Sequence, residues 1–204
     1  SPVKTIEDAR AREVTVAGTG AASSTDIFPV VMNAVMGTRF RVISGYVGTQ
    51  ETLLALERGE TDGRCGWSWS SIKSSKANWV TEKKLNFLVQ LGLRKNPAAP
   101  DAPLVMDLIR DEADRQLMRV LVAPQAITRP YLAPPGLPAA RAADVRKAFA
   151  LAVADEGFRA EFTKIVGEPP SPTSGEDMQK ILDEIYATPP EVVSRLKAVL
   201  SKMK

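Results

Sequence analysis

Apolar residues along the first half of the chain follow two spacings, one typical of strands and one typical of helices. Runs of β-branched and other apolar residues predict strands over residues 14–17, 39–46, 61–69 and 85–93. Apolar residues at helical spacing predict a helix that is capped by Ser24 or Thr25 and stops at Gly37. A second helix is predicted from a cap at Thr49 to a stop at Gly59. Strands that alternate with helices in this way indicate a parallel, doubly wound α/β sheet.

Helices dominate the second half of the chain. Proline-rich stretches over residues 96–103 and 127–138 favour extended connections, because each proline disfavours helix at the residue before it. Apolar residues at helical spacing predict helices over residues 112–122, 139–154, 156–165, 175–186 and 189–203. The pattern therefore indicates an α/β unit that is followed by a set of helices.

The composition narrows the class of protein. The 204 residues carry a net charge of +3, and they contain neither an apolar run long enough to span a bilayer nor a visible signal peptide. Basic residues are scattered among nearly as many acids, which argues against nucleic acid as a partner. The chain has no histidine, the commonest general base and a frequent metal ligand, so we expect neither catalysis nor a metal site. The single cysteine, Cys65, cannot form an internal disulfide and fits a small buried side chain better than a reactive thiol.

A loop of small residues, "GTGAASST" at residues 18–25, separates the first predicted strand from the first predicted helix. A nucleotide phosphate loop would need a lysine, and no lysine stands between Val14 and Arg39. A dinucleotide fingerprint would need a glycine where Ser23 stands and an acidic residue at the end of the next strand, which is absent. Both nucleotide interpretations are therefore disfavoured.

The same loop suits a smaller anion. Gly18 and Gly20 let the chain turn tightly, and the first turn of the helix presents unpaired N–H groups and the positive end of the helix dipole. The hydroxyls of Ser23, Ser24 and Thr25 can donate to a carboxylate, or they can cap their own helix. A carboxylate, which can be held without a lysine, is the anion that this junction predicts.

Two further segments belong to the next predicted strands. The segment "GYVGTQE" places Tyr46 and Gly48 where a helix begins, and "GETDGR" places Asp62 and Arg64 on one side of a short strand. In open α/β sheets, ligands bind in a crevice at the carboxyl ends of the strands, where these junctions would meet. Arg64 can pair with the carboxylate of a ligand or with an acid such as Asp62.

The order and spacing of these segments resemble a known family. The stretches "SPVKTIEDAR", "VTVAGTGAASSTD", "GYVGTQETLLALERGETDGR" and "YLAPPGLPAARAADVRKAF" together resemble the solute receptors of tripartite tricarboxylate transporters, the Bug family of bacterial periplasmic binding proteins. The resemblance implies a periplasmic-binding-protein type II-like fold of two α/β lobes. Residues 1–126 would form the second lobe, and residues 127–204 would form the crossing segment and the C-terminal helices of a partial first lobe.

The resemblance also implies where the protein works and what it binds. Family receptors are periplasmic, and they deliver a small organic carboxylate, often a dicarboxylic or aromatic acid, to two membrane subunits. Backbone N–H groups and hydroxyls of the strand–helix loops hold the carboxylate, and no cofactor takes part. Carried over by position, the ligand-binding residues are Thr19, Gly20, Ala22, Ser23, Ser24, Tyr46, Gly48, Asp62 and Arg64.

Family receptors are longer than this chain, so the resemblance implies a half-site that lacks the N-terminal part of the first lobe. The terminal helices would then find a packing partner in a second copy of the chain, as a homo-oligomer. We expect a binding protein without catalytic activity. Two alternatives stay open, the effector-binding domain of a transcription regulator and a nicotinamide-dependent enzyme. Trp67 and Trp69 can flank an aromatic ligand, although packing in the core or at its rim is the simpler expectation.

Overall fold

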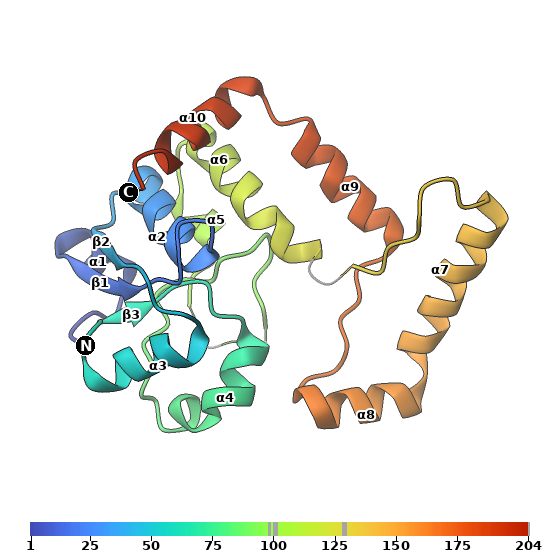
Figure 1. The fold of residues 1–204 in the computed structure, drawn as a ribbon, viewed down its shortest axis with the longest axis horizontal. Coiled ribbons are helices and arrows are strands. Elements are labelled where there is room, and N and C mark those ends of the chain that lie inside the picture. Colours follow the sequence, from blue (N-terminus) through green and yellow to red (C-terminus); the bar gives the residue numbers. More distant parts are fainter. Residues whose placement is uncertain (98, 100–101, 128–129, 204) are drawn as a thin grey trace.

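The chain folds into an α/β lobe with a helical extension at one side, as the computed structural model in Figure 1 shows. The structure describes residues 1–97, 99, 102–127 and 130–203. The strands are β1 (Val14–Ala17), β2 (Phe40–Ile43) and β3 (Gly63–Arg64). The helices are α1 (Ile6–Ala11), α2 (Ser24–Met36), α3 (Thr49–Arg58), α4 (Trp69–Thr81), α5 (Val105–Leu108), α6 (Glu112–Val122), the 3-10 helix η1 (Ala123–Ile127), α7 (Ala139–Ala154), α8 (Glu156–Val166), α9 (Gly175–Tyr186) and α10 (Pro190–Leu200).

Three parallel strands form the sheet, in the order β2-β1-β3. Val16 of β1 lies opposite Val42 of β2 on one side and Gly63 of β3 on the other. The chain crosses from β1 through α2 to β2, and it then returns past β1 through α3 to β3. Because such crossovers are right-handed, the two helices cover opposite faces of the sheet. The predicted parallel, doubly wound sheet is therefore confirmed, and its strand order reverses between β1 and β3.

Glycines end the two crossover helices where the sequence predicts. Gly37 follows α2 with a φ of 68°, and Gly59 follows α3 with a φ of 71°. This left-handed conformation favours glycine, because any Cβ would meet the following carbonyl. The N–H of Gly59 also donates to the carbonyls of Ala55 and Leu56, which satisfies acceptors in the last turn of α3.

The predicted N-caps lie one or two residues too far along the chain. Ser23, and not Ser24 or Thr25, is the N-cap of α2, and its hydroxyl accepts a hydrogen bond from the N–H of Thr25 at 3.2 Å. Gly48 is the N-cap of α3, so Thr49 is already the first helical residue and does not cap. Both N-caps have extended backbones, whereas the predicted caps lie inside the helices.

The most apolar of the predicted strands, over residues 85–93, does not join the sheet, so that prediction is wrong. Gln90 forms an isolated bridge with Leu104 instead. The N–H of Gln90 donates to the carbonyl of Pro103 at 2.8 Å, and the N–H of Val105 donates to the carbonyl of Gln90 at 2.9 Å. The run thus pairs with the segment that leads into α5, and β3 forms the edge of the three-stranded sheet. The strand predicted over residues 14–17 matches β1, and the strands predicted over residues 39–46 and 61–69 are present but shorter than expected.

The core of the lobe lies between the sheet and the helices that cover it. Its largest fully buried side chains include Ile6, Met32, Leu117 and Met118. Val192 of α10 joins this core, because α10 packs against α2 and α6. Burial of an apolar side chain of this size contributes about 1.5–3 kcal/mol to stability. The division of the chain at residue 126 stays a prediction, but α10 shares the core of the residues before that point.

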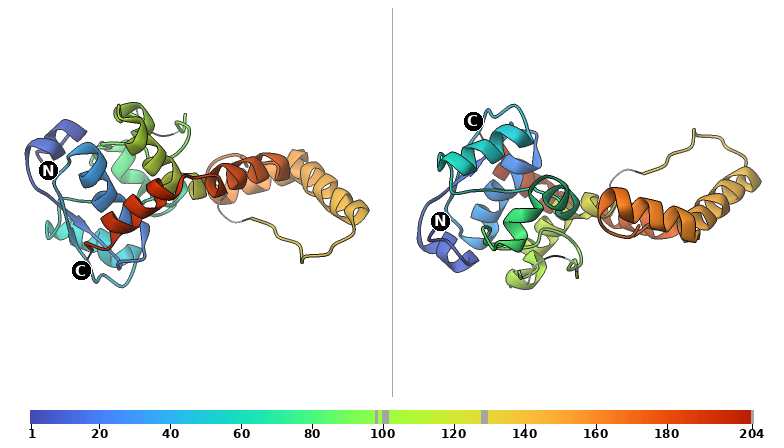
Figure 2. Two further views of the ribbon diagram at one scale, coloured as in Figure 1. Left: turned by 90° about the horizontal axis from the view of Figure 1, so that it is seen from above. Right: turned by 90° about the horizontal axis from the view of Figure 1, so that it is seen from below.

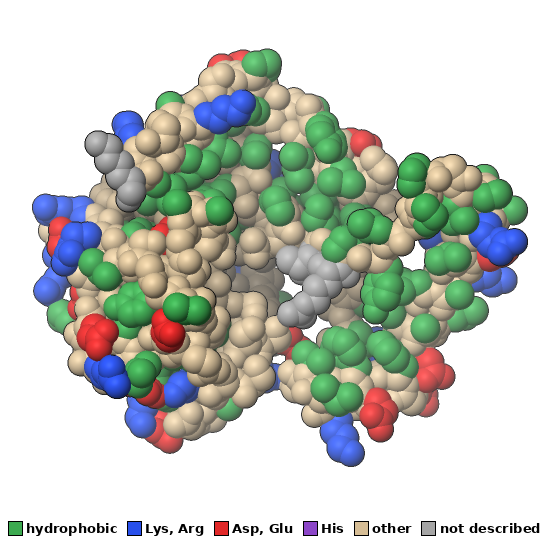
Figure 3. Space-filling model, in the orientation of Figure 1, with side chains coloured by type: hydrophobic (Ala, Val, Ile, Leu, Met, Phe, Trp, Pro, Cys, Tyr) green, Lys and Arg blue, Asp and Glu red, His purple; other side chains and the backbone are tan. Residues whose placement is uncertain are grey.

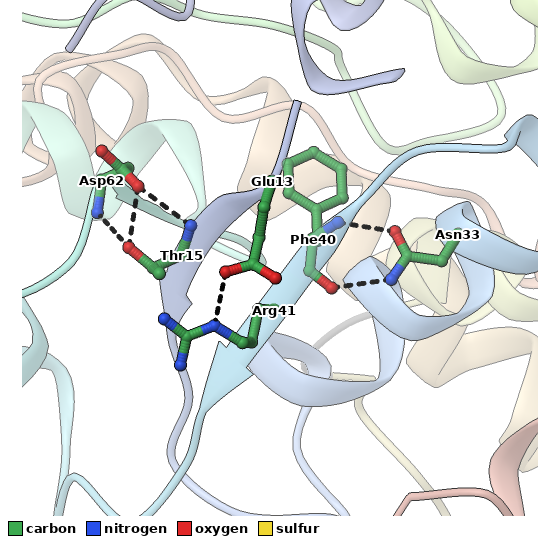
Figure 4. Close-up of polar contacts among 6 residues, drawn as sticks. All are labelled: Glu13, Thr15, Asn33, Phe40, Arg41 and Asp62. Atoms are coloured by element: carbon green, nitrogen blue, oxygen red, sulfur yellow. Dashed lines mark hydrogen bonds and ion pairs between the residues drawn. The ribbon is translucent and has the colours of Figure 1, made fainter. Parts of the chain in front are cut away.

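Side chains also fix the strands and α2 relative to one another (Figure 4). Asn33 of α2 donates to the carbonyl of Phe40 at 2.7 Å and accepts from the N–H of the same residue at 2.8 Å. Arg41 of β2 pairs with Glu13, which precedes β1, at 2.7 Å. Because Asn33 satisfies both backbone groups at the start of β2, it fixes the position of α2 on this strand.

The helices α7 and α8 extend away from the lobe (Figure 2). Neither helix has a buried residue, and apolar side chains such as Leu151 and Ile165 are 63% and 76% exposed. Figure 3 shows hydrophobic side chains over this extension. Lys73 of α4 donates a hydrogen bond to the carbonyl of Gly167 and so links the end of α8 to the lobe. Within the described residues, we find no helix with the length and apolar character needed to cross a membrane.

Candidate functional site

The loop after β1 encloses a carboxylate that belongs to the chain itself. Asp26, in the first turn of α2, is only 2% exposed. Its Oδ1 accepts hydrogen bonds from the N–H of Gly20 at 3.1 Å and from the hydroxyl of Thr25 at 2.9 Å. Its Oδ2 accepts from the hydroxyl of Ser44, directly after β2, at 2.6 Å. Asp26 therefore supplies a negative group at the start of α2, where the helix dipole favours one, and it links the ends of β1 and β2.

The hydroxyls of this loop bond mainly to one another. The hydroxyl of Thr19 donates to the Oγ of Ser23 at 2.8 Å and lies 3.0 Å from the Oγ1 of Thr25. The hydroxyls of Ser23 and Thr25 also share a hydrogen bond. The N–H of Thr19 donates to the Oγ1 of Thr25 at 2.9 Å. Of the two roles that the sequence leaves open for Ser23, the structure shows the capping of α2.

Some backbone amides near the start of α2 have no hydrogen-bond partner within the loop. No hydrogen bond joins the N–H groups of Ala21, Ala22 and Ser24 to any described residue. A Cβ on Gly66 would lie 2.7 Å from the Oγ of Ser24, so the turn after β3 packs directly against this helix start. We call these three amides and the adjoining turn the α2 junction. It lies where the strand order reverses, which is the usual ligand position in open α/β sheets.

The loop after β2 lies against the loop after β1. The N–H of Tyr46 donates to the carbonyl of Gly18 at 3.2 Å, which brings Tyr46 beside the first loop. The N–H of Val47 is used within its own loop, because it donates to the Oε2 of Glu51 at 2.7 Å. No hydrogen bond to a described residue uses the N–H of Gly48. The structure thus brings the predicted residues of the first two junctions together.

Asp62 bonds to the neighbouring strand. Its Oδ2 accepts from the N–H of Thr15 at 3.0 Å and from the hydroxyl of Thr15 at 2.8 Å (Figure 4). These bonds, chiefly the one from the N–H, hold the pKa of Asp62 below its usual value of 3.8. In the part of the chain that the structure describes, no ion pair joins Asp62 to Arg64. Asp62 and Arg64 are therefore near each other in the sequence but do not form an ion pair in the described structure.

Arg64 lines a cavity of about 770 Å³ beside β3. The lining of this cavity, which we call the β3 cavity, includes Val16, Met32, Arg64, Trp67, Trp69, Trp79 and Phe87. The Nε and Nη1 atoms of Arg64 are enclosed and have no hydrogen-bond partner among the described residues, and burial lowers the pKa of this guanidinium. Its Cζ lies 5.2 Å from the centre of the Trp67 ring. This geometry is that of a cation–π contact.

The structure divides the nine predicted binding residues between two places. Asp62 and Arg64 line the β3 cavity. The other seven, which come from the first two junctions, do not line it. They are Thr19, Gly20, Ala22, Ser23, Ser24, Tyr46 and Gly48. The nine residues stay a prediction as a binding site, and Gly66, which packs against Ser24 and lines the β3 cavity, adjoins both places.

Sequence reasoning missed two features of this region. The spacing from Ser23 to Asp26 is that of a capping pair, in which an acid three residues after the N-cap turns back toward the preceding loop. That signal could have identified Asp26 as an occupant of the loop. The β3 cavity gave no comparable signal, because it depends on Phe87 and its neighbours staying apart from β3.

The chemistry of the region favours the binding of an anion. Within the described residues, no group of three or more histidine, cysteine, aspartate or glutamate side chains could hold a metal ion. Burial raises the pKa of Cys65, which also lines the β3 cavity, to about 12, so its thiol is protonated at neutral pH. The groups without a hydrogen-bond partner among the described residues are N–H donors, and some of them belong to the cationic side chain of Arg64.

The sheet and its helices have the fold of a periplasmic-binding-protein type II-like lobe, and two solved structures share it. One is a TctC solute-binding protein from Polaromonas without ligand, with a TM-score of 0.67 and 14% identity over 100% of this chain and 63% of that protein. The other is Rpa4515 from R. palustris with adipate, with a TM-score of 0.54 and 14% identity over 98% of this chain and 62% of that protein. The chain thus spans less than two thirds of the length of either protein. No family model and no curated protein matches the sequence.

Proposed function

We propose that the chain is the ligand-binding lobe of an extracytoplasmic solute-binding protein, which captures a small organic carboxylate for a tripartite tricarboxylate-type transporter. Its partners would be the membrane subunits of that transporter, its compartment would be the periplasm, and it would bind without catalysis. The fold supports this proposal, since one similar protein is a TctC solute-binding protein and the other is seen with adipate, a dicarboxylate.

The observation that carries the proposal is the set of free amides at the α2 junction, two of which, those of Ala22 and Ser24, belong to predicted binding residues. Ala22 is exposed and Ser24 is half-buried, and neither N–H bonds to a described residue. Ser24 is the first residue of a 13-residue helix and Ala22 directly precedes its N-cap, so the helix dipole adds to their attraction for an anion. Thr19 and Gly20 give the loop its shape through their internal hydrogen bonds. The ligand carboxylate would accept from the two free amides.

The remaining predicted residues would complete the site. Tyr46 and Gly48 would wall it on the side of β2, and the positive charge of Arg64 would act from the side of β3. The carboxylate of Asp26 lies nearby and already balances part of the helix dipole. We therefore expect weak and reversible binding, which suits a receptor that must release its ligand.

A proline at position 24 tests the amide directly. Proline lacks an N–H and is well tolerated at the first position of a helix, and Ser23 already has the extended backbone (φ −96°, ψ 153°) that a following proline requires. Ser24→Pro should therefore remove one donor without unfolding α2. The matched control is Glu156→Pro, which occupies the same helix position in α8 after the extended Asp155.

Isothermal titration with adipate and other aliphatic mono- and dicarboxylates is the measurement. We expect Ser24→Pro to weaken the best of these ligands about tenfold, the usual size of a lost hydrogen bond to a charged group, and Glu156→Pro to leave it unchanged. Equal affinity in the two variants would place the carboxylate away from the α2 junction and would overturn the proposal.

A further inference from the structure

The β3 cavity contains polar groups that the α2 junction does not explain. Four nitrogen atoms with buried N–H groups have no hydrogen-bond partner among the described residues. They are Nε and Nη1 of Arg64, Nε1 of Trp67 and Nε1 of Trp69. All three residues line the same cavity. Most buried polar groups in native proteins are paired, because an unpaired one loses its hydrogen bonds to water, so four unpaired N–H groups in one cavity indicate a missing partner.

All four unpaired groups are donors, which defines what a ligand would have to bring. An arginine or indole nitrogen accepts no hydrogen bond, so only acceptor atoms can satisfy them. The acids that line the cavity have partners of their own. Glu57 pairs with Lys76, and Asp62 bonds to Thr15. Arg64 has no carboxylate within ion-pair distance in the described structure. The missing group is therefore an acceptor, and beside a cation it is best a negative one.

The walls of the β3 cavity are aromatic. All three tryptophans of the chain line it. Trp67 meets Trp79 edge to face, with ring centres 6.4 Å apart and planes at 87°, and Trp69 meets Phe87 at 6.0 Å and 70°. In each pair the edge of one ring meets the face of the other. The ring that contributes its edge therefore has neither face covered by the other ring of the pair. Flat aromatic surfaces of this kind stack well on a planar ligand.

The size of the cavity fits a small molecule. Its volume of about 770 Å³ lies within the range of roughly 300–1,000 Å³ that is usual for sites of drug-sized ligands. The apolar side chains of Val16 and Met32 complete the lining on the side of β1 and α2. Such a pocket, mostly apolar with a few placed donors, has the composition of a binding site.

From these contacts we propose that the β3 cavity is a second binding site, distinct from the α2 junction, which takes a planar aromatic anion such as an aromatic carboxylate. The anionic group would accept hydrogen bonds from Arg64 and from the indole N–H groups of Trp67 and Trp69. The aromatic body would lie against the rings that line the cavity. The proposal stands on Trp67, Trp69 and the donors of Arg64, which line this cavity, whereas the amides of Ala22 and Ser24 do not line it. Gly66, in the turn after β3, borders both places.

Calorimetric titration of the protein with three ligands tests the class of ligand without any mutation. The first is 2-naphthoate, which is planar and anionic. The second is 2-naphthylmethanol, which is planar and neutral, and the third is cyclohexanecarboxylate, which is anionic and not planar. We expect 2-naphthoate to bind at least tenfold more tightly than the other two, because only this ligand satisfies both the donors and the rings. Equal affinity for all three, or no binding of 2-naphthoate at millimolar concentration, would overturn the proposal.

Substitutions then locate the site. Arg64→Met keeps an unbranched side chain with an apolar stem and removes the charge and the donors, and it should weaken 2-naphthoate at least tenfold. Arg58→Met, on the exposed surface of α3, is the matched control and should change nothing. Trp69→Phe keeps an aromatic ring without the N–H and should weaken 2-naphthoate severalfold even if Arg64→Met fails to fold. Unchanged affinity in Trp69→Phe and in a folded Arg64→Met would exclude this cavity.

The same titrations separate this proposal from the one for the α2 junction. Ser24→Pro should weaken an aliphatic carboxylate and leave 2-naphthoate unchanged, whereas Trp69→Phe should do the reverse. Loss of 2-naphthoate binding in Ser24→Pro to the same extent as in Trp69→Phe would show one site instead of two, and would contradict the inference.

Discussion

Gly18 and Asp26 approach so closely that no side chain fits between them. A Cβ on Gly18 would lie 2.3 Å from the Oδ1 and 2.7 Å from the Cγ of Asp26. Gly18→Ala should therefore push the buried carboxylate away from its donors and destabilise the fold by about 1–3 kcal/mol. Chemical denaturation measures the change. Gly63→Ala is the control, because it lies in strand β3 and a Cβ there meets only the Cγ1 of Val16, at 3.8 Å. A similar loss in both variants would show that the contact with Asp26 is not the cause.

Asp26 accepts hydrogen bonds from one N–H and two hydroxyls, so its charge and its acceptor capacity both matter. Asp26→Asn places an amide NH₂ against these donors, and we expect a loss of about 1–3 kcal/mol in the free energy of unfolding. Ser44→Ala removes one donor and should soften the penalty when it is combined with Asp26→Asn. Additive effects of the two substitutions in a double-mutant cycle would mean that the pair does not interact.

The pKa of Asp62, lowered chiefly by the N–H of Thr15, gives stability a dependence on pH. A lowered carboxyl pKa contributes stability that is present above the ordinary value of 3.8 and is lost as the pH falls through the folded-state value. Asp62→Asn should therefore flatten the loss of stability below about pH 4, by less than about 1 kcal/mol because Asp62 is exposed. Denaturation curves at pH values from about 2.5 to about 6 measure how the free energy of unfolding changes. The control variant is Asp144→Asn, at an exposed position of α7 whose side chain makes no hydrogen bond to a described residue.

The thiol of the half-buried Cys65 should react slowly. With a pKa of about 12, only on the order of one thiol in ten thousand is ionised at a pH near 8, and the thiolate is the reactive form. A disulfide reagent should therefore modify Cys65 in the folded protein at least about tenfold more slowly than it modifies an exposed cysteine. The comparison variant is Cys65→Ser combined with Ser75→Cys, which places the thiol on the exposed side of α4. Equal rates for the two proteins would contradict the protonated state of Cys65.

Local signals account for the parts of the fold that the sequence predicts well. Gly37 and Gly59 end their helices because the left-handed conformation they adopt is determined within a few residues. The helix predicted over residues 112–122 matches α6 from end to end. Its two signals are local, since the N-cap Asp111 directly precedes it and the apolar stripe lies within it. The strand predicted over residues 85–93 failed for the opposite reason. Its apolar run indicates burial, but the choice of pairing partner depends on residues far away in the sequence.

The same distinction applies to the candidate site. The loop after β1 and its contact with Tyr46 follow from the order of strands and helices. The direction of the side chains does not. Asp26 turns back into the loop, and Arg64 lines the β3 cavity, because neighbouring elements leave room there. Sequence spacing places residues on an element, and only the packing of other elements decides which groups stay free to meet a ligand.

The position of α10 has a consequence for the order in which the molecule assembles. Val192 packs into a core whose other buried residues, such as Met32 and Leu117, all precede residue 126. Until the last helix has been synthesised, α2 and α6 expose the apolar surfaces that it covers. Such long-range contacts slow folding, because a long stretch of chain must be closed into a loop before they can form. The hydrophobic core therefore stays partly exposed until α10 has packed against it. A variant truncated before α10 would keep this apolar surface exposed and would be prone to aggregate.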